Sequence, residues 1–139
     1  MGENRIKLVA ADMDGTLLNR ERKITKYTQN VIKKAMAQGV YFVPATGRAV
    51  NALPPELKEM EGIRYGIFSN GATIYDLKEE KVIYKNHFEM DRVLELMDFL
   101  KQFDLMESIS LNGQSYANKK EMENTDYYEL DSNTKAIVQ

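Results

Sequence analysis

The sequence predicts an α/β protein in two parts, a parallel-sheet core over residues 1–71 and an α+β segment over residues 72–139. In the first part, short apolar runs alternate with helical patterns. In the second part, the pattern changes to hairpins and one helix. With 139 residues, 43% of them hydrophobic and 29% charged, the chain has a globular balance and the length of one ordinary domain. The change near residue 72 is therefore a change of architecture and not of composition.

The first predicted elements are a strand and a helix. An apolar run over residues 6–11 ends at Asp12 and predicts a buried strand. After a polar loop, Thr25 is a suitable N-cap for a helix over residues 26–38. Gly39 is the expected stop signal of that helix.

The next apolar run, residues 40–43, predicts a second strand. A strand, a helix and a strand in this order predict a right-handed crossover between parallel strands. Residues 49–60 look helical at both ends, but two adjacent prolines predict a kink or two short helices. Residues 65–69 predict a third strand, closed by a turn at Asn70 and Gly71.

The second part is predicted to contain two hairpins and an amphipathic helix over residues 91–103. The Met and Phe side chains of that helix are expected in the core. Residues 119–139 receive no assignment. The hairpins are expected over residues 72–76 with 81–85, and over residues 107–111 with 114–118.

Composition excludes several classes of protein. No apolar run approaches the roughly 20 residues that span a bilayer, and the N-terminus does not resemble a secretory signal. The chain has no cysteine and a formal net charge of -2, which argues against thiolate chemistry and general nucleic-acid binding. These features fit a cytoplasmic protein without a membrane or nucleic-acid partner.

Two carboxylates, Asp12 and Asp14, follow the first predicted strand. The carboxyl ends of strands form the ligand crevice in open α/β sheets. Residues at i and i+2 share a face if the strand persists. Two such charges repel each other and need a cation or a shared proton, and oxygen ligands of this kind suit Mg²⁺. The alternative is that both residues merely form the turn at Gly15.

Thr46 and Gly47 follow the second predicted strand. A hydroxyl and an unobstructed backbone N–H at a helix start can bind phosphate. The alternative is an ordinary N-cap with a solvated Arg48. In a parallel sheet both strand ends face one crevice, so the Asp pair and this loop support each other as one site.

These motifs together resemble those of a known family. Asp12-Met13-Asp14-Gly15-Thr16-Leu17-Leu18 resembles the first motif of the haloacid dehalogenase (HAD) superfamily phosphatases, and Thr46-Gly47-Arg48 resembles the second. Ser69-Asn70-Gly71-Ala72 resembles a turn of the Cof-like, type IIB subfamily. The resemblance covers residues 5 to about 118. It implies a partial HAD-like, Rossmannoid core followed by the beginning of a type II cap.

The resemblance also implies roles. Asp12 would be the nucleophile that forms an aspartyl-phosphate, and Asp14 the general acid and base. Mg²⁺ would be bound by the Asp12 carboxylate and the Asp14 backbone carbonyl. Thr46 and Gly47 would hold the phosphoryl oxygens, and Asn70 would line the substrate site.

The sequence departs from the family in its later motifs. The family's third motif supplies a Lys, and its fourth is an acidic motif with a Gly-Asp pair; both follow the lid. The chain has no Gly-Asp pair, and Lys119, Lys120 and Lys135 fall within or just past the expected cap. It thus resembles a first half, whether as a piece of a longer protein, a shortened reading frame or a short protein. Alone, it is expected to be a poor phosphatase or none.

Three functions can be considered for such a sequence. The first is a Mg²⁺-dependent phosphohydrolase of a small phosphorylated metabolite, such as a sugar phosphate or nucleotide. The second is a non-hydrolytic remnant that binds Mg²⁺ or phosphate, or that complements another chain. The third, a receiver-like signalling domain, would continue to alternate strands and helices after residue 72. An unfinished sheet is compatible with self-association. His87 is expected on the surface, and Arg48 at the helix start or the core–cap seam.

Overall fold

The computed structural model describes residues 6–103, 105, 107–111 and 114–117. The chain divides into two compact units, Met1–Asn86 and His87–Gln139. Residues 119–139, which received no assignment from the sequence, lie outside the described part. None of the described helices is long and apolar enough to cross a membrane.

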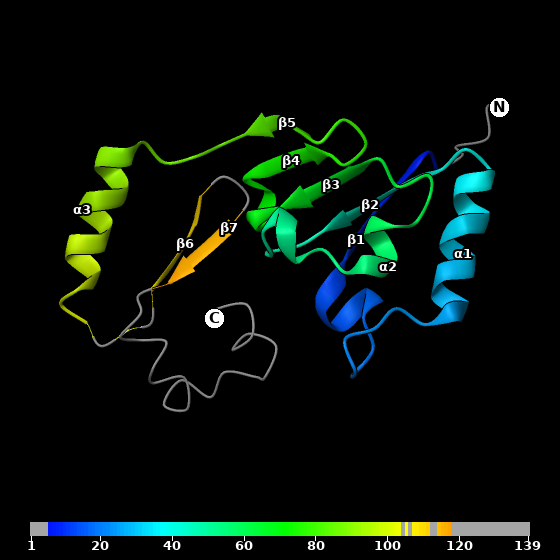
Figure 1. Cartoon of the computed structure of the whole chain (residues 1–139), viewed down its shortest axis with the longest axis horizontal. Coiled ribbons are helices and arrows are strands. Elements are labelled where there is room, and N and C mark those ends of the chain that lie inside the picture. Colours follow the sequence, from blue (N-terminus) through cyan, green and yellow to red (C-terminus); the bar gives the residue numbers. More distant parts are fainter. Residues whose placement is uncertain (1–5, 104, 106, 112–113, 118–139) are drawn as a thin grey trace. The chain divides into compact units, whose positions relative to one another are not determined.

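A five-stranded mixed sheet forms the first unit (Figure 1). Its first three strands are parallel and its last two form an antiparallel hairpin, as the sequence predicts. Strand order follows chain order from one edge to the other. The strands are β1 (Leu8–Asp12), β2 (Tyr41–Ala45), β3 (Tyr65–Phe68), β4 (Thr73–Asp76) and β5 (Lys81–Lys85).

The helices of this unit begin and end where the sequence places their signals. Helix α1 (Lys26–Ala37) is capped by Thr25, whose Oγ1 accepts the N–H of Thr28 at 3.1 Å. Two short helices, Val50–Ala52 and α2 (Pro55–Lys58), replace a longer one. The proline pair explains the break, because a proline lacks the N–H that a continuous helix would need.

A single apolar core holds these elements together. It combines Ile32 of α1 and Leu57 of α2 with Phe42 and Phe68 of the sheet. Met13, from the turn after β1, belongs to the same cluster and is fully buried. Burying a side chain of this kind contributes about 1.5–3 kcal/mol, so the core fixes both helices and the turn.

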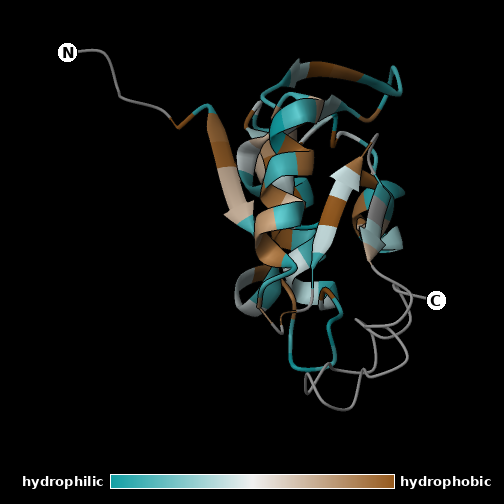
Figure 2. Cartoon of the chain, turned by 90° about the vertical axis from the view of Figure 1, so that its left-hand side faces the viewer, coloured by the Kyte–Doolittle hydropathy of each residue, from teal (hydrophilic) through white to brown (hydrophobic). Residues whose placement is uncertain are grey.

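Strand β1 is not buried, which corrects the prediction from its apolar sequence. Leu8 is 55% and Val9 37% exposed. The reason is topological, because β1 is an edge strand that pairs with β2 on one side. In Figure 2, β1 follows the grey N-terminal trace, and its brown start lies at the margin of the unit.

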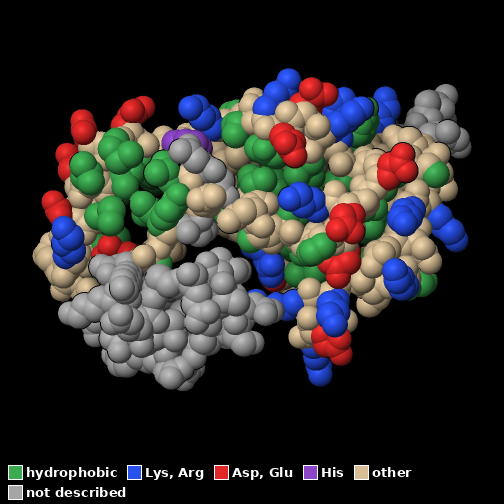
Figure 3. Space-filling model, in the orientation of Figure 1, with side chains coloured by type: hydrophobic (Ala, Val, Ile, Leu, Met, Phe, Trp, Pro, Cys, Tyr) green, Lys and Arg blue, Asp and Glu red, His purple; other side chains and the backbone are tan. Residues whose placement is uncertain are grey.

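The second unit contains α3 (Met90–Leu100) and a hairpin of β6 (Ser108–Leu111) and β7 (Gln114–Ala117). These elements match the prediction. The expectation that the helix buries its Met and Phe side chains is wrong, because no α3 residue is buried. Figure 3 shows its apolar side chains open to view. One helix and one hairpin, among the described residues of this unit, offer too little surface to cover it.

The hairpin of β4 and β5 continues the sheet of the first unit. The sequence predicts a boundary between core and cap near residue 72. In the structure, β4 pairs with β3 along its whole length, and the boundary between the compact units follows Asn86. A sheet keeps its strands in one unit whatever their direction, because backbone hydrogen bonds link each strand to the next.

Candidate active site

The site residues predicted from the sequence lie at the carboxyl ends of β1, β2 and β3. The parallel register pairs Asp12, the last residue of β1, with Ala45, the last residue of β2. Thr46 follows directly, and its N–H donates to the carbonyl of Ile67 in β3 at 2.9 Å. In an open α/β sheet, ligands bind at the carboxyl ends of the strands. These residues therefore lie where a ligand is expected to bind.

Asp12 precedes the turn Met13–Leu17, and Asp14 is the second residue of that turn. Its first residue is buried in the core, while Asp12 and Asp14 on either side are exposed. The N–H of Leu18 donates to the Met13 carbonyl at 2.9 Å and closes the turn. Gly15 takes φ +79°, a left-handed conformation that favours glycine. A buried anchor thus presents two carboxylates to solvent.

Asp12 lies at the strand end with its carboxylate near Thr16. The Thr16 hydroxyl donates to Asp12 Oδ2 at 3.4 Å, a long hydrogen bond. Asp12 is exposed, so its carboxylate can be approached from solvent. Both properties suit a group that must reach a ligand.

Thr46 is buried and hydrogen-bonded in the loop after β2. This residue is 6% exposed, and its Oγ1 accepts the N–H of Arg48 at 3.1 Å. Its carbonyl accepts the N–H of Asn70 at 3.2 Å. The Thr46 hydroxyl is therefore held by its own loop.

Gly47 and Asn70 are in close contact. A Cβ atom placed on Gly47 would lie 2.8 Å from Asn70 Oδ1, closer than real carbon atoms allow. Ser69 and Asn70 both have positive φ, +50° and +55°, a conformation that is uncommon for residues other than glycine. The turn after β3 therefore brings Asn70 against the loop after β2, beside the expected phosphate site.

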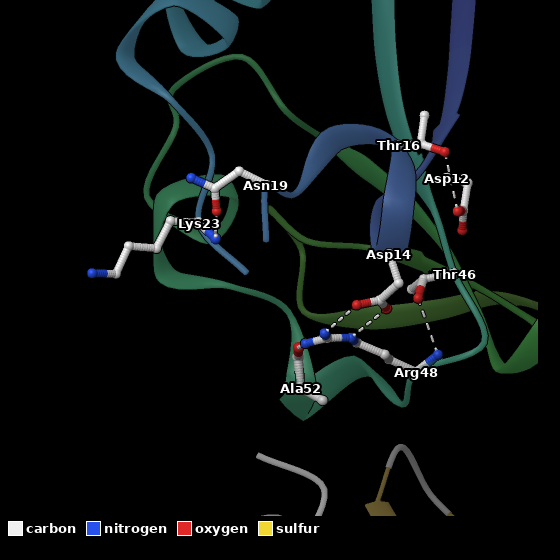
Figure 4. A network of polar contacts seen from close by, with 8 residues as sticks. All are labelled: Asp12, Asp14, Thr16, Asn19, Lys23, Thr46, Arg48 and Ala52. Carbon is white, nitrogen blue, oxygen red and sulfur yellow. Dashed lines mark hydrogen bonds and ion pairs between the residues drawn. The ribbon is translucent and has the colours of Figure 1, made fainter. Parts of the chain in front are cut away.

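Arg48 forms a two-point ion pair with Asp14, which is not predicted from the sequence. Its Nε donates to Asp14 Oδ2 at 2.9 Å, and its Nη2 to Oδ1 at 2.6 Å. Figure 4 shows the two side chains facing each other across the loops that follow β1 and β2. A signal existed in the sequence: an acid and a base follow neighbouring parallel strands at similar distances from the strand ends.

The donor set fits a hard divalent cation with few protein ligands. Asp12 offers a carboxylate, and Asp14 a backbone carbonyl on the same turn. In the described part of the chain, no group of three or more His, Cys, Asp or Glu residues could hold a metal ion. Mg²⁺ is often held by one or two carboxylates and keeps several waters, so these two donors suit it.

The chain matches known proteins over most of its length. The family model of haloacid dehalogenase-like hydrolases matches residues 9–139. A Buchnera aphidicola (subspecies Schizaphis graminum) protein, provisionally named a phosphatase, is 38% identical over 121 residues, which are 85% of this chain and 43% of that protein. The Bacillus subtilis 5-amino-6-(5-phospho-D-ribitylamino)uracil phosphatase YcsE is 37% identical over 89 residues, 61% of this chain and 36% of its own.

Solved structures show the same fold. The HAD subclass IIB sugar phosphatase BT4131 matches with a TM-score of 0.70 at 26% identity, over 88% of this chain and 48% of that one. A Streptococcus mutans protein, at 20% identity, matches with a TM-score of 0.75. The chain thus spans less than half the length of these relatives. The family predicted from the motifs is confirmed, and the chain belongs to the haloacid dehalogenase-like hydrolases.

Proposed function

We propose that this chain carries the nucleophile, the acid–base group and the phosphate loop of a Mg²⁺-dependent phosphatase. The observation that supports this most is that the candidate residues lie at the carboxyl ends of two parallel strands in register. Asp12 ends β1 and Asp14 follows it, while Thr46 and Gly47 follow β2. Membership of a hydrolase family with phosphatase relatives points the same way. Because the chain spans less than half of those relatives, the activity of the whole protein belongs to the proposal.

In the proposed reaction, an Asp12 carboxylate oxygen attacks phosphorus while the bond to the leaving oxygen breaks. Asp14, in its protonated form, donates its proton to that oxygen and releases the alcohol. Water then attacks the aspartyl-phosphate, and Asp14 takes the proton from it. The phosphorus–Asp12 bond breaks, which frees phosphate and restores both side chains.

Thr46 and Gly47 bind the phosphoryl oxygens in this scheme. The Thr46 hydroxyl and the Gly47 N–H are suitable donors, and the fixed Thr46 loop costs little reorganisation. The Asp12 carboxylate and the Asp14 carbonyl would hold Mg²⁺, which reduces the repulsion between an anionic nucleophile and an anionic substrate. Asn70, packed against Gly47, would contact the substrate beside the phosphate.

The proposed substrate is a small phosphorylated metabolite. One relative is named for a phosphorylated ribitylamino-uracil and one solved structure is a sugar phosphatase, which supports this class. The Lys and the second acidic motif expected by resemblance are not recognisable in this sequence. Removing one electrostatic donor typically costs about 10²–10³ in rate, so the chain alone should turn over slowly. We further expect a cytoplasmic location.

The test combines ligand binding with turnover. In the wild-type chain, inorganic phosphate with Mg²⁺ should shift the amide resonances of Asp12, Thr46 and Gly47. p-Nitrophenyl phosphate should be hydrolysed slowly. Asp12→Asn should abolish hydrolysis, because an amide is a poor nucleophile, and should only weaken Mg²⁺ binding. Asp98→Asn, at an exposed carboxylate of the second unit, is the matched control and should change neither result.

Other outcomes separate the alternatives. Binding at these amides without turnover favours the non-hydrolytic reading. Phosphate shifts confined to other residues would refute the site, and turnover retained by Asp12→Asn would refute the covalent mechanism. Robust turnover by this chain that Asp12→Asn removes would instead show that the later motifs are dispensable.

A further inference from the structure

We infer that Arg48 is a positioning residue, which holds the Asp14 carboxylate in one orientation through their two-point ion pair. This inference rests on the proposed role of Asp14 as the base that takes the proton from water, the step in which its carboxylate is ionised, and extends it to a residue that has no step of its own in that scheme. A guanidinium bound side-on to a carboxylate restricts both the position and the rotation of that carboxylate, because two parallel hydrogen bonds must be kept.

The pair differs from the exposed i,i+3 ion pairs in the described part of the chain. Arg92 with Glu95 and Lys101 with Asp98 join neighbouring turns of helical chain and are at least 63% exposed. Exposed ion pairs of that kind contribute little to stability, because solvent screens the charges and both side chains lose conformational freedom. Asp14 and Arg48 are 34 residues apart in sequence, and the Arg48 side chain is only 20% exposed. This pair therefore joins two separate loops.

Arg48 is itself fixed from several sides. Its N–H donates to Thr46 Oγ1 at 3.1 Å, and its carbonyl accepts the N–H of Ser69 at 3.0 Å. Its Nη1 reaches the Ala52 carbonyl at 3.4 Å. The Arg48 backbone is thus tied to Thr46 and to the turn after β3, and its guanidinium also contacts the short helix Val50–Ala52.

Asp14 lies at a position where such a support affects the proposed reaction. Its side chain is 48% exposed, and its backbone lies in the turn Met13–Leu17, outside any regular strand. A proton transferred in the transition state requires a group at hydrogen-bond distance and in the right direction. A misplacement of about 1 Å can reduce the rate on the order of 10²-fold.

The first test reads orientation without any turnover. Three-bond couplings from the Asp14 side chain report how many χ1 rotamers it populates. The wild-type chain should show one dominant rotamer, and Arg48→Gln should show averaged couplings. Arg48→Lys should fall between them, because an ammonium group cannot form the fork. Averaged couplings in the wild type, or unchanged couplings in Arg48→Gln, would overturn the inference.

A matched control removes a similar ion pair elsewhere in the same unit. Arg64 pairs with Asp76 through Nε and Nη2, both at 3.0 Å from Oδ2, at the opposite end of β3. Arg64→Gln should leave the Asp14 couplings unchanged. If it averaged them as strongly as Arg48→Gln does, the effect would be a general loosening of the unit and the inference would fail.

The second test uses the turnover that Asp12→Asn abolishes. Arg48→Gln should lower kcat about 10- to 100-fold with KM within about threefold, as expected for loss of positioning rather than of substrate binding. In an Asp14→Asn background the same change should have no further effect, because the group that it positions is gone. Equal losses in both backgrounds would overturn the inference. If the wild-type chain shows no turnover, as the missing later motifs would explain, the rotamer measurement alone decides the role of Arg48.

Discussion

Met13 is the residue whose truncation should most directly disturb the proposed site without touching its chemistry. It lies between Asp12 and Asp14, is fully buried, and belongs to the apolar core. Its carbonyl also closes the turn by accepting the N–H of Leu18. Met13→Ala removes packing while leaving both carboxylates and that backbone hydrogen bond in the chain.

The expected cost follows from burial. Truncation removes the Cγ, Sδ and Cε atoms, and about 0.8 kcal/mol for each buried group gives roughly 2.4 kcal/mol. A cavity that does not collapse adds to this, so we expect about 3 kcal/mol, within the range of about 2–5 kcal/mol for such changes. Met13→Leu nearly conserves the volume and should cost less than about 1.5 kcal/mol.

Urea unfolding followed by far-UV circular dichroism and tyrosine fluorescence measures both variants, since the chain has eight Tyr and no Trp. Met90→Ala, at an exposed methionine of the second unit, is the control and should change stability by less than about 0.5 kcal/mol. If Met13→Ala costs less than about 1 kcal/mol, or no more than Met90→Ala, the buried anchor is refuted. If it prevents folding, Met13→Leu still tests the argument, and a large cost for that variant would contradict it.

Three further predictions concern stability. Thr25→Ala should destabilise the first unit by about 1 kcal/mol, because the N–H of Thr28 loses its cap; a thermal melt tests this, and Thr25→Ser should retain most of the stability. Gly15→Ala should cost about 1–2 kcal/mol from its left-handed backbone alone, because an added Cβ meets nothing within 4 Å; a neutral result would contradict the turn conformation. Burial raises the pKa of Asp76, but the Glu79 N–H, the Arg64 guanidinium and the Lys78 N–H outweigh it, so that pKa lies below its ordinary value of 3.8. Its contribution to stability is thus present above pH 3.8 and lost as pH falls through the lowered pKa. Urea midpoints measured down to about pH 2 should show this loss in the wild type but not in Asp76→Asn, and identical profiles would contradict it.

The local elements were predictable because their signals are local. The apolar runs at β1, β2 and β3, the cap at Thr25 and the proline pair after Leu53 each act within a few residues of chain. Backbone and side-chain preferences over such short distances do not depend on the rest of the fold. The crossover rule then made the first two strands parallel, which was enough to expect Asp12 and Thr46 at one edge.

Burial was not predictable in the same way. The apolar sequence of β1 is typical of a buried strand, yet its position at the sheet edge leaves Leu8 and Val9 exposed. The stripe of α3 is also typical of a core helix, yet none of its residues is buried. Hydrophobic periodicity indicates which face of an element can be buried. Whether that face is covered depends on the elements that pack against it.

By itself, the sequence determined the strand and helix order, the family and the identity of the proposed reactive groups, since these depend on residue type and spacing. Only the tertiary structure decided that β4 and β5 extend the sheet and that Asn70 packs against Gly47. It also decided that Arg48 forms a two-point ion pair with Asp14, which is 34 residues away in the sequence. The physical reason is distance in sequence: an ion pair between two loops forms only when the strands beneath them have been placed side by side.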